Sequence, residues 1–195
     1  MDSFPVSDGI INPEVKSADD PALYIHFLKE ESGMIEIRRI QPHEWSAAKR
    51  VVYRVAHAIF NDPRTLEESI AYYESKHELK DMDDIQKNYF ESGGIFLVML
   101  DEGQFICTGA IRNLKDDICE LKRLWLLTEY HSQGLGYRML NELLAFAREK
   151  GYKRIWLETD PIAQSRAVEF YKRLGFYEIP GYSERHDEVA MEMIL

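Results

Sequence analysis

A loop between an apolar strand and a helix carries the residues best suited to chemistry. It reads YHSQGLGY over residues 130–137, with glycines at positions 134 and 136. Without Cβ atoms, these glycines let a ligand approach the backbone. The free N–H groups of the first helical turn point outward and, together with the helix dipole, favour a phosphate group. The loop therefore predicts a phosphate-binding site; the alternative is a tight turn without a ligand.

Two well-known phosphate-binding patterns fit this loop poorly. A Walker A loop needs Gly-Lys followed by Ser or Thr, which is absent here. The dinucleotide fingerprint needs a third glycine, where Met139 stands, and a tight turn, where residues 128–133 are inserted. Glu158 does follow at about the 20-residue distance that this fingerprint requires, so it stays open as an alternative.

A third pattern extends over much more of the chain. From about Ile118 to the C-terminus, the sequence resembles the GNAT superfamily of N-acetyltransferases. Four segments carry the resemblance in order: CELKRLWL (119–126), HSQGLG (131–136), LETD (157–160) and AVEFYKRLGFYEI (167–179). The last segment contains the family's A-x-x-x-Y-x-x-x-G-F pattern, and the closing IPGYSERHDEVAMEMIL resembles the endings of small-molecule members.

The resemblance implies acetyl-CoA as cosubstrate and no metal. The family's pyrophosphate loop begins with Gln or Arg, where this chain has His131, and Gln164 stands where many members have an asparagine that contacts pantetheine. The implied fold splays the strand ending at Leu126 from the strand starting near Lys153, which frees backbone for the pantetheine amides. The implied CoA-binding residues are Leu124, Trp125, Leu126, His131, Ser132, Gln133, Gly134, Leu135, Gly136, Tyr137, Arg138 and Gln164.

Acetylation of an amine poses two proton problems. A lysine-like amine with a pKa of about 10.4 is only about one part in 10³ neutral at pH 7, so a base must take its proton. The resemblance to histone-acetyltransferase members points to Glu120, eleven residues before His131. The alternatives are that Glu120 is a structural carboxylate paired with Lys122 or Arg123 and that an ordered water is the base, as in many members. Tyr171 matches the tyrosine placed near the CoA sulfur, where it would protonate the thiolate; the alternative is a core aromatic.

Other side chains are candidates for the acceptor pocket. Glu158 and Asp160 end a strand, where they would bind a cationic substrate or lie solvated. Trp45, Tyr72 and Tyr73 come from the early helical region, where they would line the pocket or pack.

The elements that must position these residues are visible as periodicity. Helical spacing of apolar residues predicts helices over 42–60, 134–150 and 165–174, with one or two polar surface helices in 65–90. Apolar stretches predict strands over 34–40, 95–101, 104–114, 118–127, 154–160, 176–179 and 188–195, with hairpin turns at 102–103 and 115–117. This order predicts a mixed α/β fold, a central mixed sheet flanked by helices.

Length and composition limit the number of domains and the classes of partner. The 195 residues, 45% of them hydrophobic, suffice for one domain, expected over 35–195 after an extension over 1–34. A net charge of −10 argues against nucleic-acid and anionic-membrane partners, while residues 115–175 carry 11 Lys+Arg against 9 Asp+Glu and would receive an anionic ligand. Cys107 and Cys119 are too few for a disulfide framework or a metal cluster. With no secretory signal expected at the N-terminus, the prediction is a cytoplasmic protein.

The sequence thus predicts a cytoplasmic enzyme that transfers an acetyl group to a primary amine of a small molecule in a ternary complex. Two rivals stay open: a protein or peptide N-acetyltransferase, and an acyl-CoA sensor without turnover. A homodimer is compatible with the sequence.

Overall fold

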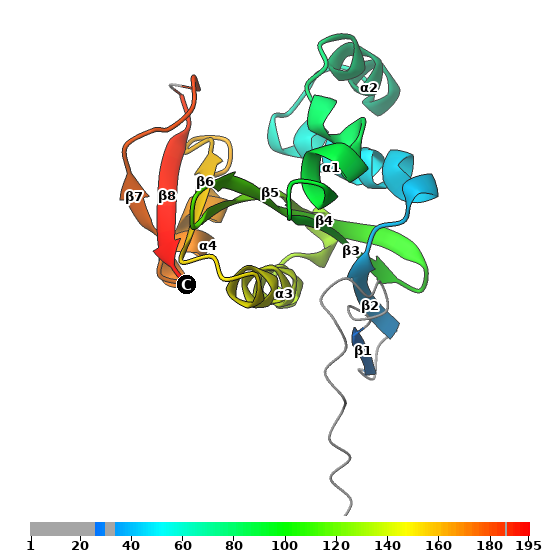
Figure 1. Cartoon of the computed structure of the whole chain (residues 1–195). Helices are drawn as coiled ribbons and strands as arrows, with labels where there is room; N and C mark the ends of the chain where they lie inside the picture. Colours follow the sequence, from blue (N-terminus) through cyan, green and yellow to red (C-terminus); the bar gives the residue numbers. More distant parts are fainter. Residues whose placement is uncertain (1–25, 30–33, 186) are drawn as a thin grey trace, which may run out of the picture.

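The computed structural model describes residues 26–29, 34–185 and 187–195, so most of the predicted extension lies outside the described residues. Figure 1 shows a single curved sheet with helices on both faces. The strands are β1 (His26–Lys29), β2 (Met34–Arg39), β3 (Ile95–Asp101), β4 (Gln104–Lys115), β5 (Ile118–Leu126), β6 (Arg154–Thr159), β7 (Tyr177–Ile179) and β8 (Val189–Ile194). The helices are α1 (Trp45–Ile59), α2 (Leu66–Ser75), α3 (Leu135–Glu149) and α4 (Ser165–Arg173).

The sheet order is β1-β2-β3-β4-β5-β6-β8-β7. Neighbouring strands run antiparallel except β5 and β6, which are parallel and are connected through α3. The predicted mixed sheet flanked by helices is therefore confirmed. The strand at 26–29 pairs with β2, so this part of the chain before residue 35 belongs to the same sheet.

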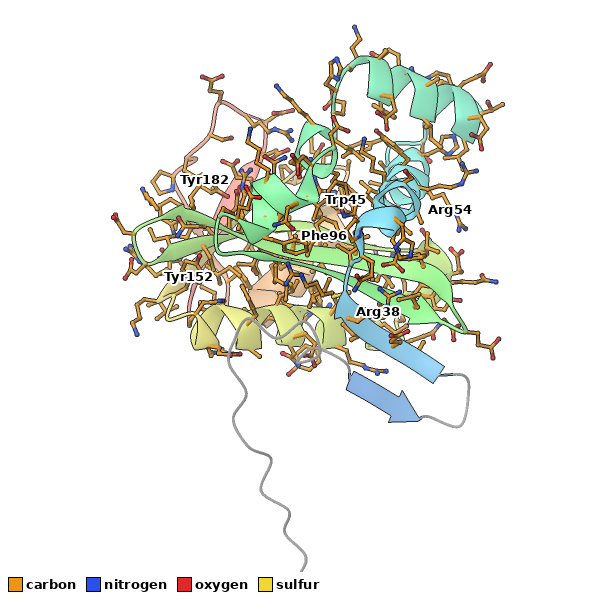
Figure 2. The ribbon with its side chains drawn as sticks, turned by 45° about the vertical axis from the view of Figure 1, so that its right-hand side comes forward. Arg38, Trp45, Arg54, Phe96, Tyr152 and Tyr182 are labelled. Atoms are coloured by element: carbon orange, nitrogen blue, oxygen red, sulfur yellow. The ribbon has the colours of Figure 1, made fainter. Side chains whose placement is uncertain are left out.

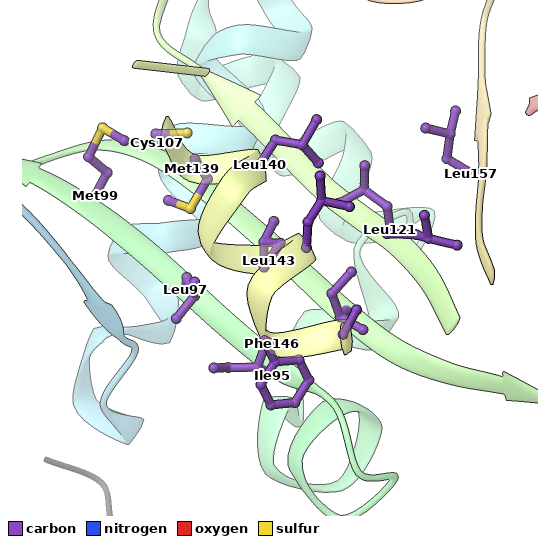
Figure 3. Packing of buried hydrophobic residues seen from close by; sticks show 14 of the residues in the cluster. Ile95, Leu97, Met99, Cys107, Leu121, Met139, Leu140, Leu143, Phe146 and Leu157 are labelled. Atoms are coloured by element: carbon purple, nitrogen blue, oxygen red, sulfur yellow. The ribbon is translucent and has the colours of Figure 1, made fainter. Parts of the chain in front are cut away.

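Alternation along the strands divides the core between the two faces. In β3, Leu97 and Met99 pack on the face covered by α3, while Phe96 and Val98 pack on the face of α1. Figure 3 shows the first face, where Leu140 and Leu143 of α3 lie over the strands. Figure 2 shows Phe96 on the second face, below α1. The apolar residues predicted from the period of 2 in the strand and of 3.6 in the helices thus pack against one another on both faces of the sheet.

Tight turns occur where the sequence predicted them. Glu102 and Gly103 both have positive φ, 48° and 82°, which matches the twist of the β3–β4 hairpin. Asp116, with φ 46°, turns β4 into β5. The polar stretch 65–90, predicted to form one or two surface helices, forms one regular helix, α2, followed by the short 3₁₀ turn η3 (Lys80–Met82) and the π-helical turn η4 (Gln86–Phe90).

Strands β5 and β6 separate soon after they begin to pair. Their ladder joins residues 118–120 to 154–156, although β5 continues to Leu126 and β6 to Thr159. Within the described residues, the β6-facing edge of β5 from residue 121 onward is therefore free of strand partners. This is the splayed pair that the resemblance implied.

A bulge lies in the free part of β5. Arg123 and Leu124 face the single residue Gly109 of β4, where the register shifts. Arg123 has φ 56°, in the left-handed region that costs about 1–2 kcal/mol for a residue with a Cβ atom. A bulge re-aims side chains and edge groups, and here it does so beside the opening between β5 and β6.

Candidate active site

A cavity of about 610 Å³ opens between the end of β5, the start of α3 and the start of α4. Ten of the twelve predicted CoA-binding residues line it: Leu124, Trp125, Leu126, His131, Ser132, Gly134, Leu135, Gly136, Tyr137 and Gln164. Gln133 and Arg138 lie outside the lining; the Gln133 amide donates to the Glu129 carbonyl at 3.2 Å. We call this space the α3 cavity.

The start of α3 presents backbone donors to this cavity. Gly134 is the N-cap residue with φ 76°, and no side chain caps the helix. The Arg138 N–H donates to the Gly134 carbonyl at 3.0 Å, so the N–H groups of the preceding turn have no partner within the helix. Ser132, with φ 64°, also takes the left-handed conformation. A negatively charged group would be stabilised here by the donors and by the helix dipole.

The charges of the α3 cavity suit an anion. Its described lining contains no carboxylate, whereas Arg166 and Arg173 of α4 contribute two guanidinium groups. Sequence reasoning missed these two arginines, because their place beside the loop depends on how α4 packs in three dimensions. It also missed Val55, Ala58 and Ile59 of α1, whose helical spacing indicated only a buried face.

His131 and Gln164 are each held by hydrogen bonds. The His131 Nε2 atom lies 3.1 Å from the Leu126 carbonyl oxygen, which ties the loop to the end of β5. The Gln164 Oε1 atom accepts from the Thr159 hydroxyl at 2.6 Å and from the Asp160 N–H at 3.2 Å. Because both partners act as donors to that oxygen, the amide nitrogen of Gln164 is the group left to donate into the cavity.

A second cavity, of about 340 Å³, lies on the other side of the same opening. We call it the acidic cavity, because five carboxylates line it: Glu78, Glu158, Asp160, Asp187 and Glu188. The two cavities share five lining residues, Leu124, Trp125, Gln164, Ala167 and Tyr171. They therefore meet at the β5 bulge and the middle of α4.

The cationic side chains of the acidic cavity share one feature, an ion-pair partner. The pairs are Lys122 with Glu120 at 3.5 Å, Arg185 with Glu188 at 2.7 Å, and Arg123 with Asp81. Among the residues the structure describes, the carboxylates of Glu78, Glu158, Asp160 and Asp187 have no ion-pair partner within 4 Å. The cavity thus offers negative charge that its own cations do not neutralise.

Tyr171 lies where the cavities meet. It is 7% exposed, and its ring packs against Phe170 and Phe176 at centroid distances of 5.5 and 5.4 Å. Burial, with a smaller contribution from Cys107, raises the pKa of the phenol above its ordinary value of 10. Tyr171 thus packs in the core and also lines both cavities, which combines the two alternatives given for it from the sequence. The raised pKa keeps its hydroxyl protonated.

Glu120 lies apart from both cavity linings. It is 2% exposed, and its Oε2 atom accepts from Arg112 Nε at 2.5 Å. Its Oε1 atom accepts from the Tyr182 hydroxyl at 3.0 Å and lies 3.5 Å from Lys122 Nζ. The structure therefore brings Tyr171 to the junction of the cavities and holds Glu120 in a separate polar cluster.

Of the five candidates for the acceptor pocket, three line the acidic cavity and two do not. Glu158, Asp160 and Tyr73 line the acidic cavity. Tyr72 lies outside both linings, and the Arg64 guanidinium lies over its ring at 3.8 Å. Trp45 packs in the core on the α1 face of the sheet.

Comparison with known proteins decides the family. Residues 60–176, more than half of the chain, match the model of the acetyltransferase (GNAT) family. The chain belongs to the GNAT family. Among curated relatives it is 32% identical over 101 residues to the uncharacterized N-acetyltransferase YjgM of Escherichia coli, covering 50% of this chain and 60% of that protein. It is 34% identical over 102 residues to human N-acetyltransferase 8B, covering 49% of this chain and 44% of the relative.

Solved GNAT structures share the fold. A GNAT-family acetyltransferase from Staphylococcus aureus superposes with a TM-score of 0.69 at 18% identity, covering 82% of this chain and 98% of that one. The PaiA N-acetyltransferase of Thermoplasma acidophilum, solved in complex with coenzyme A, gives 0.65 at 21% identity, covering 83% and 99%. The matches to the two relatives named above span 60% and 44% of those proteins' own lengths. The comparisons thus show the family and the fold, and the reaction and its acceptor are inferred from the two cavities.

Proposed function

We propose that this protein transfers the acetyl group of acetyl-CoA to a primary amine of a small, positively charged molecule. The observation that carries the proposal is the meeting of two oppositely charged cavities at Tyr171. One lining contains arginines without carboxylates among the described residues, and the other contains carboxylates without free cations. An anionic cosubstrate and a cationic acceptor would therefore enter from opposite sides.

The α3 cavity fits acetyl-CoA in three respects. The N–H groups before Arg138 would bind the pyrophosphate, and Arg166 and Arg173 would add charge that favours its phosphates. The free edge of β5 and the amide of Gln164 would bind the pantetheine amides. Bound acetyl-CoA supplies an activated acetyl group as a thioester. The role of the protein is then to bring the amine to this group in one ternary complex, so that proximity supplies much of the rate.

The acidic cavity fits an amine that carries further positive charge. A substrate ammonium group would find Glu158 or Asp160 without displacing an ion pair of the protein. Arg185, Asp187 and Glu188, between β7 and β8, line the cavity on one side. Side chains on several sides of a 340 Å³ space support a small acceptor over a peptide lying in an open groove.

Tyr171 is proposed as the acid that protonates the departing thiolate. Its raised pKa keeps the proton on the phenol, and proton transfer must be coupled to cleavage of the thioester bond because the thiolate is the weaker base. No hydrogen bond engages the hydroxyl within the described part of the chain, so the proton is available to a group in the cavity.

The base is proposed to be a carboxylate, and two candidates differ in position. Glu120 is the candidate from the sequence resemblance, but Arg112, Lys122 and Tyr182 surround its carboxylate. Glu158 lines the acidic cavity, and its Oε1 atom accepts from the Tyr182 N–H at 3.3 Å, which leaves Oε2 for an amine or a water. The cavity lining supports Glu158, and Glu120 stays the rival prediction.

The direct test measures release of the CoA thiol from acetyl-CoA with a panel of acceptors. The panel holds a monoamine, a diamine and a longer polyamine of one chain type, an amino sugar, and peptides with free N-termini or lysines. We expect turnover with small amines and a higher kcat/KM for those with a second positive charge. Turnover with peptides alone would assign the chain to the protein-modifying alternative. Binding of acetyl-CoA without thiol release for any acceptor would assign it to the sensor alternative.

A further inference from the structure

The bulge of β5 is held by two side chains from other parts of the chain. The Thr108 hydroxyl, fully buried on β4, donates to the Arg123 carbonyl oxygen at 2.7 Å. The Arg123 guanidinium makes a two-pronged contact with Asp81, with Nε 2.9 Å from Oδ2 and Nη2 bonded to Oδ1. One contact fixes the backbone of the bulge, and the other fixes its side chain.

Asp81 belongs to η3, far from β5 in the sequence. Its side chain is 16% exposed and that of Arg123 15%, so the pair is largely removed from water. The Tyr89 hydroxyl also donates to Asp81, and Arg123 Nη2 donates to the Glu78 carbonyl at 3.3 Å. Burial raises the pKa of Asp81, but the bonds from Arg123 and Tyr89 outweigh it, so the net shift is downward and the carboxylate stays charged.

A buried ion pair of this kind is weak evidence of stabilisation. Removing two charges from water costs about as much as their attraction returns, and apolar replacements are often neutral. A two-pronged Arg–carboxylate pair does, however, define geometry well. A role in fixing geometry therefore explains the pair better than a role in stability.

The geometry that it fixes is that of the active site. Arg123 has φ 56°, a conformation that a side-chain-bearing residue keeps only when its surroundings impose it. Without the bulge, the register of β5 would slip by one residue and move Leu124 and Trp125 to the opposite faces of the strand. These two residues line both cavities, at the edge where β5 has left β6.

We infer that Asp81 is a positioning residue for acetyl transfer: through Arg123 it holds the β5 bulge so that Leu124 and Trp125 shape the junction of the two cavities. This inference rests on the proposed function. Because the charge of Arg123 is already paired with Asp81, we expect Arg123 to fix the conformation of β5 and not to bind the substrate. The start of α3 lines the α3 cavity alone, so we expect its contacts with acetyl-CoA to change little.

The test uses the full chain with Asp81→Asn, which keeps size and removes the charge. We expect kcat to fall about 10- to 100-fold, as for a misplacement of about 1 Å, while the Kd of acetyl-CoA changes less than about 3-fold. Asp117→Asn is the control for losing an Asp–Arg ion pair elsewhere, because Asp117 pairs with Arg154 at 3.0 Å outside both cavities, in a more exposed position than Asp81. Asp81→Glu, which restores the charge, should recover part of kcat.

A second readout does not depend on turnover. With 5-fluorotryptophan in place of tryptophan, the ¹⁹F resonance of Trp125, assigned by its loss in Trp125→Phe, should shift in Asp81→Asn and stay in Asp117→Asn. Thr108→Val reaches the same bulge from β4 and should give the same two effects if Asp81→Asn does not fold. A lower Tm with unchanged kcat per folded molecule and an unchanged resonance would overturn the inference. If wild-type protein acetylates no amine, the proposed function fails, and the ¹⁹F shift still decides whether Asp81 holds the bulge.

Discussion

At the residue scale, Tyr171 combines two roles that usually compete. Its ring packs against Phe170 and Phe176, and the residue lines both cavities where they meet. The apolar surroundings that stabilise the ring also raise the pKa of the phenol. Packing therefore keeps the proton in place for the proposed transfer to sulfur.

Replacing Tyr171 by Phe separates these two roles. The ring and its contacts remain, so the Tm and the acetyl-CoA affinity should stay close to wild type. Loss of the hydroxyl should lower kcat about 10- to 10³-fold, the range of general-acid effects. Both quantities are to be measured on one preparation. Full kcat in Tyr171→Phe would refute the role as acid.

The two carboxylate candidates are separated by a matched pair of substitutions. Glu158→Gln should lower kcat most at low pH, where deprotonation of the amine limits the rate. Glu120→Gln should lower the Tm, because it leaves the Arg112 guanidinium beside a neutral amide, and should change kcat less. The measurements are pH–rate profiles and thermal melts of both variants. A selective low-pH defect in Glu120→Gln, with Glu158→Gln unaffected, would instead make Glu120 the base.

At the element scale, sequence patterns predicted what local physics determines. Periods 2 and 3.6 predicted the order of the helices and of every strand except β1, and the glycine at 134 marked the start of α3. The bulge at Arg123 and the ion pair with Asp81 were not predicted, because contacts between residues distant in sequence create both. The separation of β5 from β6 came from family resemblance alone, since nothing in residues 118–126 themselves indicates where pairing stops.

The loop before α3 gives a prediction at this scale. Gly134 has φ 76°, so Gly134→Val would strain the backbone and displace the N–H groups of the first turn. We expect the Kd of acetyl-CoA to rise at least about 10-fold in calorimetry. Gly151→Val is the matched control, because Gly151 also has a positive φ, 86°, has no atom within 4 Å of an added Cβ, and lies outside both cavity linings. Unchanged affinity in a folded Gly134→Val protein would contradict the pyrophosphate site.

At the scale of the whole molecule, charge is separated between two cavities. A chain with a net charge of −10 nevertheless presents a cavity whose described lining has no carboxylate. The other cavity receives Glu78 from the turn after α2, and Asp187 and Glu188 from the residues directly before β8. Among the described residues no helix is long and apolar enough to span a bilayer.

Acid should destabilise the fold through carboxylates with lowered pKa values. For Asp81 and Glu44, burial works against ionisation, but ion pairs with Arg123 and Arg38 bring the folded-state pKa below the ordinary 3.8 and 4.5. Such groups stabilise the folded state above the unfolded pKa, and this is lost as pH falls through the folded pKa. The Tm should therefore decline below about pH 4, and less steeply in Asp81→Asn. Equal slopes in both proteins would rule out Asp81 as a source of this dependence.

Direct transfer between the two cavities is best tested by an initial-velocity study of CoA thiol release, with acetyl-CoA and a diamine both varied. A ternary complex at the junction of the two cavities predicts rates that depend on both substrates and reciprocal plots that intersect. One N-acetylated amine should form for each thiol released. Parallel plots, or no thiol release at any diamine concentration while acetyl-CoA still binds, would contradict direct transfer between the two cavities.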